Sequence, residues 1–409
     1  MRESTTRRLA SLAVGALVMP LALTACSSSS SSGGSGGSSA ASQCGSGAGI
    51  GKPANGTLKI GFQGPLSGDN QQLGINARDG MKVAIEQANS SNALPYKLQL
   101  VESDDMGSPD QGPTAAQKLV DDQGVVAVVG PMFSGATKAS EPVFCQNGVL
   151  SISPSATNPA LTSLGFSNFV RVIAPDTVQG KAAADYISKT LAAKKVFSLD
   201  DKSEYGTGLS SALEAQLRAN GTQVVHDGIN PTKDYTSEAT KIVGENPDVL
   251  YYSGYYAELA LLAKALKAKG FQGKIVSGDG SNDDQYIAQA GADVANGSYL
   301  TCACGDANSD PKAAQFVQQY SSLNNGSKPG TYSGEAYDAT NALIEVLKGL
   351  GQNADRATVI DGYKKVDFTG LTKQVKFQPN GEVEGDAVYI YQVKNGKREV
   401  LGLTKDLIK

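Results

Sequence analysis

The stretch "VVAVVGPMFSGATKASEPVFCQNGVLSISPS" (residues 125–155) decides the fold class. It opens with "VVAVVG", an apolar run of strand length, and "VLSIS" (residues 149–153) is a second such run. The segment between them begins as a helix at "FSGAT" and ends near Cys145. Continuous Val- and Ile-rich runs are expected for strands covered on both faces. A strand, a helix and a strand in this order imply a parallel sheet with right-handed crossovers, so we predict an α/β fold.

The same unit repeats along the chain from Leu58. Apolar residues recur at helical spacing between the strands, for example at Ala77, Met81, Ala84 and Ile85. Nine runs form the strand candidates: "LKIGFQG" (58–64), "KLQLVESD" (97–104), "VVAVVGP" (125–131), "VLSISPS" (149–155), "KKVFSLDD" (194–201), "TQVVHDGI" (222–229), "DVLYYSGY" (248–255), "KIVSGDG" (274–280) and "SYLTCAC" (298–304).

Nine strands are more than one lobe of this length usually holds, and three segments are candidates for crossings between two lobes. The first is "FVRVIAPDTVQG" (residues 169–180), a strand-like run followed by a proline and a helix start. The second is residues 305–308, which precede two long helices, and the third is the terminal hairpin at residues 387–400, with its Asn395-Gly396 turn. Three such crossings make a hinge. We predict lobe 1 at residues 57–174 plus 305–382 and lobe 2 at residues 175–304 plus 383–409.

The first 25 residues have the pattern of a lipoprotein export signal. A positive start is followed by an apolar run (residues 9–23) that is too short to span a membrane. "LTAC" resembles a lipobox and ends at Cys26, whose acyl chains would hold the chain on a membrane. Ser and Gly then predict a flexible linker over residues 26–56. The alternative is an ordinary secreted protein in which Cys26 is incidental.

Charge and histidine content exclude several function classes. Without residues 1–25 the chain has 33 basic and 39 acidic residues, a net charge of about −6, and it shows no basic stripe. Nucleic acid is therefore not an expected partner. His226 is the only histidine, so a metal could not have two histidine ligands and a Ser-His-Asp triad would depend on this residue. Its strand-like surroundings predict a structural role.

The cysteines after Cys26 are Cys44, Cys145, Cys302 and Cys304. In an exported protein they are expected to form disulfides. The "CAC" spacing is too short for a usual zinc site, and we expect neither a metal nor a cofactor.

Ligands of open α/β sheets bind beyond the carboxyl ends of the strands. In the first lobe Ser134 starts a helix there, and the free N–H groups of such a start suit a carboxylate. Ser155 and Thr157 follow the next strand, in a loop stiffened by prolines. Taken singly, Ser134 is more simply explained as a helix N-cap, and the loop hydroxyls as caps.

The second lobe offers different chemistry at the same edge. Tyr205 precedes a helix, Tyr255 and Tyr256 follow a strand, and Asp279 lies at the tip after the next strand. An Asp before a glycine is also a common turn residue. Together, one lobe supplies hydroxyls and N–H groups for an anion, and the other supplies a carboxylate and phenols for a cation. That combination would hold a zwitterion.

Several stretches resemble the substrate-binding proteins of branched-chain amino acid ABC importers, the Leu/Ile/Val-binding type. They are "GPLSGDNQQLGINARDGMKVAIEQAN" (64–89), "VVGPMFSGAT" (128–137), "SISPSATNPALT" (151–162), "DDKSEYGTGL" (200–209) and "DVLYYSGYYAE" (248–258). The resemblance covers Leu58 to the end of the chain. It implies the type I periplasmic-binding-protein fold, in which each lobe is a mainly parallel sheet flanked by helices. Three hinge strands join the lobes, which close around one amino acid.

The resemblance also implies roles for individual residues. The α-carboxylate would be bound by Ser134, Ser155 and Thr157. The α-ammonium would be bound by the backbone of Ser155, by Thr157 and by Asp279, at a position where the family usually has glutamate. The remaining positions that line the ligand would be Leu73, Phe133, Tyr205, Tyr255 and Tyr332.

Two departures from the family leave the ligand open. Asp279 is one methylene shorter than glutamate, and Leu73 stands where the family has an aromatic residue. A second ligand class therefore remains: an amide, urea, a short peptide or an aromatic acid. A disulfide of the family's first lobe is absent, because Met106 and Phe133 stand at its positions.

The thiols of this chain suggest another pairing. A helix that starts at the ligand cleft ends at the far side of its lobe, where strands begin. Cys145 and Cys44 should both lie there, so we predict a Cys44–Cys145 disulfide. Cys302 and Cys304 could bond each other, although that spacing is strained.

These features predict an extracytoplasmic solute-binding lipoprotein, lipid-anchored to the outer face of the cell membrane. It would be a monomer that delivers an amino acid to the permease and ATPase subunits of an ABC importer. The alternative is a sensor that passes closure to a signalling partner. An enzyme is not expected, because the sequence shows no nucleophile–base pair, metal set or phosphate loop.

Overall fold

The computed structural model describes residues 44–408. The predicted signal sequence, Cys26 and the first part of the linker lie outside these residues. All nine strand candidates form strands, in alternation with helices, which confirms the predicted fold class. Within the described residues no helix has the length and apolar character needed to cross a membrane.

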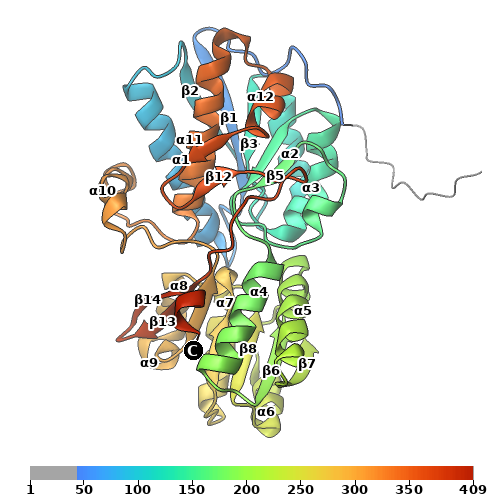
Figure 1. Ribbon diagram of the computed structural model, residues 1–409, viewed down its shortest axis with the longest axis vertical. Helices are drawn as coiled ribbons and strands as arrows, with labels where there is room; N and C mark the ends of the chain where they lie inside the picture. Colours follow the sequence, from blue (N-terminus) through green and yellow to red (C-terminus); the bar gives the residue numbers. More distant parts are fainter. Residues whose placement is uncertain (1–43, 409) are drawn as a thin grey trace, which may run out of the picture. The chain divides into compact units, whose positions relative to one another are not determined.

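A five-stranded parallel sheet in the order β2-β1-β3-β4-β5 forms the first lobe. Helix α11 comes from late in the chain and packs against α1, beside which it lies in Figure 1. The strands are β1 (Thr57–Gly64), β2 (Lys97–Asp104), β3 (Val125–Val129), β4 (Leu150–Ser153) and β5 (Phe169–Arg171). The helices are α1 (Gln71–Ser90), α2 (Gly112–Asp121), α3 (Ser134–Gln146), α10 (Ala314–Leu323), α11 (Ser333–Leu350) and α12 (Arg356–Tyr363).

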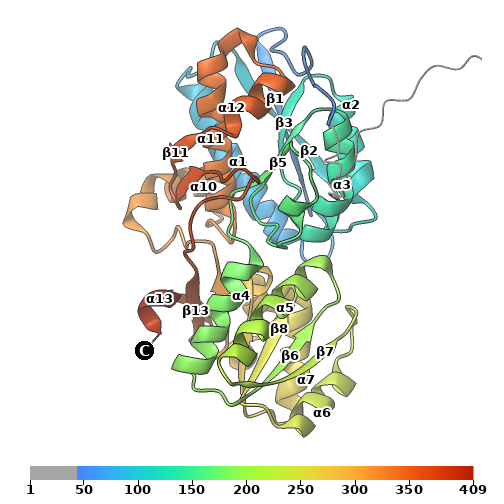
Figure 2. The same ribbon diagram turned by 45° about the vertical axis from the view of Figure 1, so that its right-hand side comes forward.

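A seven-stranded sheet in the order β14-β13-β10-β9-β8-β6-β7 forms the second lobe. Strands β6 to β10 are parallel and the terminal pair is antiparallel. Figure 2 shows α4 beside α5. The strands are β6 (Lys195–Asp200), β7 (Gln223–Gly228), β8 (Val249–Ser253), β9 (Lys274–Ser277), β10 (Tyr299–Cys302), β13 (Tyr389–Lys394) and β14 (Lys397–Leu403). The helices are α4 (Asp176–Asp185), α5 (Glu204–Ala219), α6 (Thr236–Glu245), α7 (Tyr256–Ala268), α8 (Asp284–Ala290), α9 (Ala292–Ala295) and α13 (Thr404–Leu407).

The chain passes between the two sheets three times: after β5, after β10 and before β13. The small sheet of β11 (Asp367–Thr369) and β12 (Gln374–Lys376) precedes the third passage. The β13–β14 hairpin turns at Asn395 and Gly396, whose φ angles of 50° and 71° suit the tight turn expected for this pair. The residue limits given above for the two lobes remain a prediction.

Strand β3 shows why its sequence is apolar throughout. All five of its residues are buried. Val128 packs in a cluster with residues of α2 and α3, whereas Val129 packs in a cluster with residues of α1 and α11. Helices on both faces leave no side of this strand in water, so both alternating sets of side chains are apolar.

The segment before β1 is fastened to the base of the first lobe. A disulfide joins Cys44 to Cys145 in the last turn of α3, and Gly45 N–H donates to the Cys145 carbonyl at 2.7 Å. Gly51 N–H donates to the Gln123 carbonyl at 3.0 Å. The structure thus differs from the expected linker over residues 44–56, because the disulfide and backbone hydrogen bonds hold them in place.

Candidate functional site

Asp279 lies just after β9 and starts the 3₁₀ turn Asp279–Ser281. Its carboxylate is fully buried. Oδ1 accepts hydrogen bonds from Tyr205 Oη at 2.7 Å and Gln179 Nε2 at 2.6 Å, and Oδ2 accepts one from Tyr332 Oη at 2.7 Å. Burial raises the pKa of Asp279, and the three donors lower it only in part. These donors are neutral, so a cation beside the carboxylate would be strongly favoured.

The three donors come from different elements. Tyr205 and Gln179 lie in the first turns of α5 and α4 in the second lobe, whereas Tyr332 precedes α11 in the first. The Tyr332–Asp279 hydrogen bond therefore joins the two lobes. Tyr332 has a left-handed backbone, with φ of 69°, which costs a residue other than glycine about 1–2 kcal/mol. Such strain is typical of positions where a side chain must point into a site.

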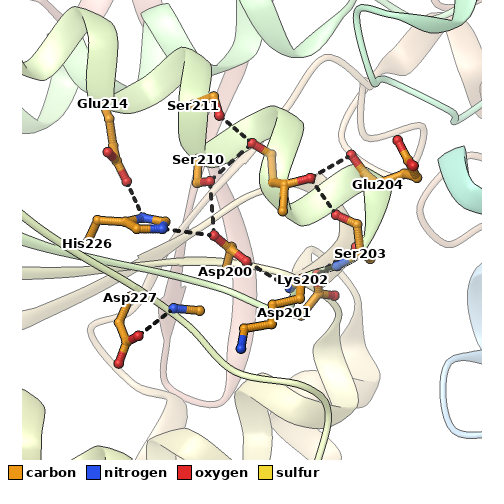
Figure 3. A network of polar contacts seen from close by, with 12 residues as sticks. Asp200, Asp201, Lys202, Ser203, Glu204, Ser210, Ser211, Glu214, His226 and Asp227 are labelled. Carbon is orange, nitrogen blue, oxygen red and sulfur yellow. Dashed lines mark hydrogen bonds and ion pairs between the residues drawn. The ribbon is translucent and has the colours of Figure 1, made fainter.

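The turn before Tyr205 is held by Asp201 and Ser203, both shown in Figure 3. The Ser203 hydroxyl donates to Asp201 at 2.6 Å and accepts from Gly206 N–H at 2.9 Å, which caps α5. This cap fixes the helix start that carries the Tyr205 phenol toward Asp279.

His226 lies in the same region but contacts other groups. Its Nδ1 is 2.6 Å from Glu214 Oε1, and its Nε2 is 3.6 Å from Asp200 Oδ2, as Figure 3 shows. These contacts join β7 to α5 and β6. They fit the structural role expected for this residue.

Aromatic rings from both lobes meet beside Asp279. Phe133 stacks on Tyr255 with ring centroids 4.3 Å apart, and Tyr205 lies 5.2 Å from Tyr255. Leu73, on α1, is fully buried in the apolar cluster that also contains Phe133 and Tyr332. The structure therefore brings Phe133, Tyr205 and Tyr255 together, whereas Leu73 is placed only within the same apolar core.

The three hydroxyls on the other side of the site differ in their contacts. Ser134 is the first residue of α3, and its Oγ accepts from Asn158 N–H at 3.2 Å instead of capping the helix. The Ser155 hydroxyl donates to the Met132 carbonyl at 2.5 Å. Thr157 is fully buried, and its hydroxyl makes no hydrogen bond of normal geometry. Thr157 is thus the hydroxyl most available to a ligand.

Asp176 is a site residue that the sequence did not single out. It starts α4, one turn before Gln179, and is fully buried. The Thr157 hydroxyl lies near, yet neither oxygen of the Asp176 carboxyl makes a hydrogen bond of normal geometry. Burial, followed by the negative charge of Asp279, raises the pKa of Asp176 well above its usual value. The sequence signal for Asp176 is the helix start in "APDTVQG", which also marks the first crossing between the lobes.

Arg171 does not satisfy Asp176, although it moderates the pKa of that carboxyl. Its Nε donates to Glu382 at 2.8 Å, and its Nη1 donates to the carbonyls of Ala156 and Asn158 at 3.0 and 2.8 Å. The guanidinium is therefore committed to other partners, and the Asp176–Asp279 pair has no positive partner of its own.

Polar contacts also join the two lobes around the site. They are Asp69 with Lys233 at 2.6 Å, Lys138 with Glu204 at 2.6 Å, Asn70 with Glu258 at 3.1 Å and Asn76 with Asp283 at 2.9 Å. Within residues 44–408, no group of three or more His, Cys, Asp or Glu side chains is placed to hold a metal ion.

The chain belongs to the periplasmic binding protein family, whose sequence profile matches residues 57–398. A Leu/Ile/Val-binding protein of Rhizobium johnstonii, BraC3, is 34% identical over 84% of this chain and 94% of its own. Leu/Ile/Val-binding protein homolog 3 of Brucella melitensis is 33% identical over 87% of this chain and 96% of its own. Membership of this family implies an extracytoplasmic solute-binding protein.

Solved structures agree with the fold. The leucine-binding protein LivK of Thermotoga maritima superposes with a TM-score of 0.78 at 27% identity, over 85% of this chain and 98% of its own. The branched-chain amino acid transporter substrate-binding protein LivJ of Streptococcus pneumoniae, in complex with isoleucine, gives 0.77 at 28% identity, over 85% and 99%. The expected resemblance to branched-chain amino acid substrate-binding proteins, and with it the two-lobed type I fold, is confirmed.

Proposed function

We propose that this protein captures a branched-chain or related amino acid between its two lobes and delivers it to an ABC importer. The observation that carries the proposal is the pair of buried carboxylates, Asp279 and Asp176, next to the available Thr157 hydroxyl. Burial raises the pKa values of both acids, and a cationic group of the ligand would supply the positive partner that their ionised forms lack. The names of the relatives support an amino acid as that ligand.

The other end of the ligand would lie toward the first lobe. The first N–H groups of α3, from Ser134 onward, have no intrahelical partner and suit a carboxylate. The backbone at Ser155 and the Thr157 hydroxyl would complete its surroundings. An apolar side chain would lie beside Leu73 and the stacked rings of Phe133 and Tyr255.

The expected interaction free energies are large enough for micromolar binding of an amino acid. Hydrogen bonds to charged groups contribute about 1.5–3 kcal/mol each. Burial of a leucine side chain adds about 1.5–3 kcal/mol. Several such contributions, less the cost of association, reach the roughly 8 kcal/mol of micromolar binding.

We also propose the cellular setting. Cys26 would carry the lipid that anchors the chain to the outer face of the cell membrane, and the partners would be the permease and ATPase subunits. The chain would act as a monomer that binds without catalysis. Metabolic labelling with a fatty acid should label the wild type and leave Cys26→Ala unlabelled.

Titration calorimetry tests the proposed ligand. Leucine, isoleucine, valine, alanine and glutamate would be titrated into the protein, together with urea, a short amide, a dipeptide and benzoate. We expect a branched-chain amino acid to bind most tightly and Asp279→Ala to abolish that binding without unfolding the protein. Tighter binding of the amide, urea, dipeptide or benzoate would favour the second ligand class, for which the shorter Asp279 and Leu73 leave room.

A further inference from the structure

We propose that the Cys302–Cys304 disulfide positions Gln179, and through it Asp279, for ligand recognition. A disulfide joins the two cysteines where β10 ends and the chain passes toward the first lobe. The inference deepens the proposed function and rests on it for the identity of the ligand. We call the chain of hydrogen bonds from Ala303 through Gln179 to Asp279 the relay, and it can be tested without any ligand.

The relay begins at Ala303, the residue that the disulfide encloses. Ala303 N–H donates to Gln179 Oε1 at 3.2 Å, and its carbonyl accepts from Lys373 Nζ at 3.1 Å. The next carbonyl, of Cys304, accepts from Tyr391 Oη at 2.9 Å. The three residues 302–304 are at most 4% exposed. The backbone on either side of the relay is therefore held from both lobes.

The relay works because the two ends of an amide are different. A glutamine side chain carries one acceptor oxygen and one donor nitrogen. With Oε1 accepting from Ala303 N–H, Nε2 must face the other way, where it donates to Asp279 Oδ1 at 2.6 Å. The reversed amide would present its oxygen to the carboxylate and repel it. Ala303 thus selects the orientation in which Gln179 supports an ionised Asp279.

The Cys302–Cys304 disulfide should fix the backbone around Ala303 and should add little to the free energy of unfolding. Stabilisation by a disulfide through the unfolded chain grows with the length of the loop that it closes. Cys302 and Cys304 are two positions apart, whereas Cys44 and Cys145 are 101 apart. The long-range disulfide is therefore the matched control: it should stabilise the fold without affecting Gln179.

A carboxyl titration in the ligand-free protein tests the relay. The pKa of Asp279 would be followed by ¹³C NMR in wild type, Cys302→Ala/Cys304→Ala, Gln179→Leu and Cys44→Ala/Cys145→Ala. Burial raises this pKa and the Gln179 hydrogen bond lowers it, with Asp176, Tyr205 and Tyr332 as the other facing groups. We expect the Asp279 pKa to rise further in the first two variants and to stay unchanged in the control. An unchanged pKa in Cys302→Ala/Cys304→Ala would overturn the inference.

A double-mutant cycle with the tightest-binding amino acid gives the functional readout. Loss of the 302–304 disulfide should raise Kd about tenfold, the scale of one hydrogen bond to a charged group. In the Gln179→Leu background the same change should have no further effect, because the relay is already broken. Additive losses would overturn the inference. If the double alanine variant does not fold, Cys302→Ala alone provides the same comparison. If no amino acid binds the wild type, the proposed function fails while the titration still decides the relay.

Discussion

Two regions of the molecule bury carboxyl groups and differ in the hydrogen-bond partners that they give them. Glu141, inside the first lobe, accepts from the Ser151 hydroxyl at 2.6 Å and from Asn168 Nδ2 at 3.2 Å. Burial raises the pKa of Glu141 to about 8, so its carboxyl is protonated at neutral pH. Asp279 and Asp176 are buried together at the site, and Asp176 has no hydrogen bond of normal geometry. Burial also raises the pKa of both carboxyls at the site, and that of Asp176 well above its usual value, so Asp176 too holds a proton in the ligand-free protein. The difference lies in the partners: the oxygens of Glu141 are engaged inside the first lobe, whereas those of Asp176 are left for a ligand whose cationic group would favour ionisation.

The largest expected change in ligand affinity comes from a substitution of Asp279. Asp279→Asn keeps the shape of the side chain and removes its charge. Hydrogen bonds to charged groups are worth about 1.5–3 kcal/mol, so Kd for the tightest-binding amino acid should rise by about 10- to 150-fold or more. Titration calorimetry at constant pH measures the Kd of both proteins. Asp279→Asn that binds as tightly as the wild type would remove the cation-binding role.

The same residue predicts a pH dependence. Because the pKa of Asp279 is raised above its ordinary value of 3.8, acid protonates it at a pH above that value. A protonated carboxyl cannot pair with an ammonium, so affinity should fall as the pH is lowered toward the raised pKa. Binding by Asp279→Asn, although weak, should lose this dependence. A wild-type Kd that is constant down to pH 4 would contradict the prediction.

Asp176→Asn tests whether the second carboxylate is kept for the ligand. Because its raised pKa keeps Asp176 protonated at neutral pH when no ligand is bound, the neutral amide should leave the ligand-free protein about as stable as the wild type. Kd should nevertheless rise, by about tenfold if one charged hydrogen bond is lost. Thermal unfolding without ligand and calorimetry with ligand measure the two effects. Lower stability with unchanged affinity would make Asp176 a structural residue like Glu141.

Tyr332→Phe probes a smaller effect. It removes one of the three hydrogen bonds to Asp279 and keeps the ring in place. Loss of one donor should raise Kd severalfold and raise the pKa of Asp279 further, because that hydrogen bond favours the ionised form. Tyr205→Phe is the matched variant within the second lobe. A loss confined to Tyr205→Phe would show that the donor from the first lobe is not needed.

Glu141→Gln should leave ligand affinity unchanged and alter stability alone. The folded protein holds this proton up to a pH of about 8, whereas the unfolded chain loses it near the ordinary value of 4.5. Between those values the folded state binds more protons, so the free energy of unfolding decreases as the pH rises. Glutamine cannot titrate, and the variant should gain stability relative to wild type between pH 5 and pH 8. Thermal unfolding of both proteins at pH 5 and pH 8 measures this gain. A difference in stability between variant and wild type that is the same at both pH values would contradict the prediction.

The fold, and the meeting of Tyr205, Tyr255 and Asp279, could be predicted from the sequence for a physical reason. Strand ends can be located from apolar runs, and Tyr205, Tyr255 and Asp279 follow such ends within five residues. Side-chain orientation cannot be predicted in this way. The sequence therefore did not distinguish the hydroxyls of Ser134 and Ser155, which are hydrogen-bonded, from that of Thr157, which has no hydrogen bond of normal geometry.

The residues that the sequence missed share one origin. Asp176 and Gln179 come from the first turn of α4, after a passage between the lobes instead of directly after a strand. Their partners are distant in sequence, because Gln179 contacts both Asp279 and Ala303. Only the folded arrangement of the second lobe brings these groups together.

The attachment of Cys44 to the end of α3 also decides where mechanical load enters the molecule. A pull on the chain ahead of residue 44 passes through the covalent link to Cys145 and is borne by the five-stranded sheet. If Cys26 carries the lipid proposed above, a pull from the membrane would enter at the first lobe and would not act across the passages between the two sheets. The grip on a captured solute would then be independent of how hard the tether is stretched.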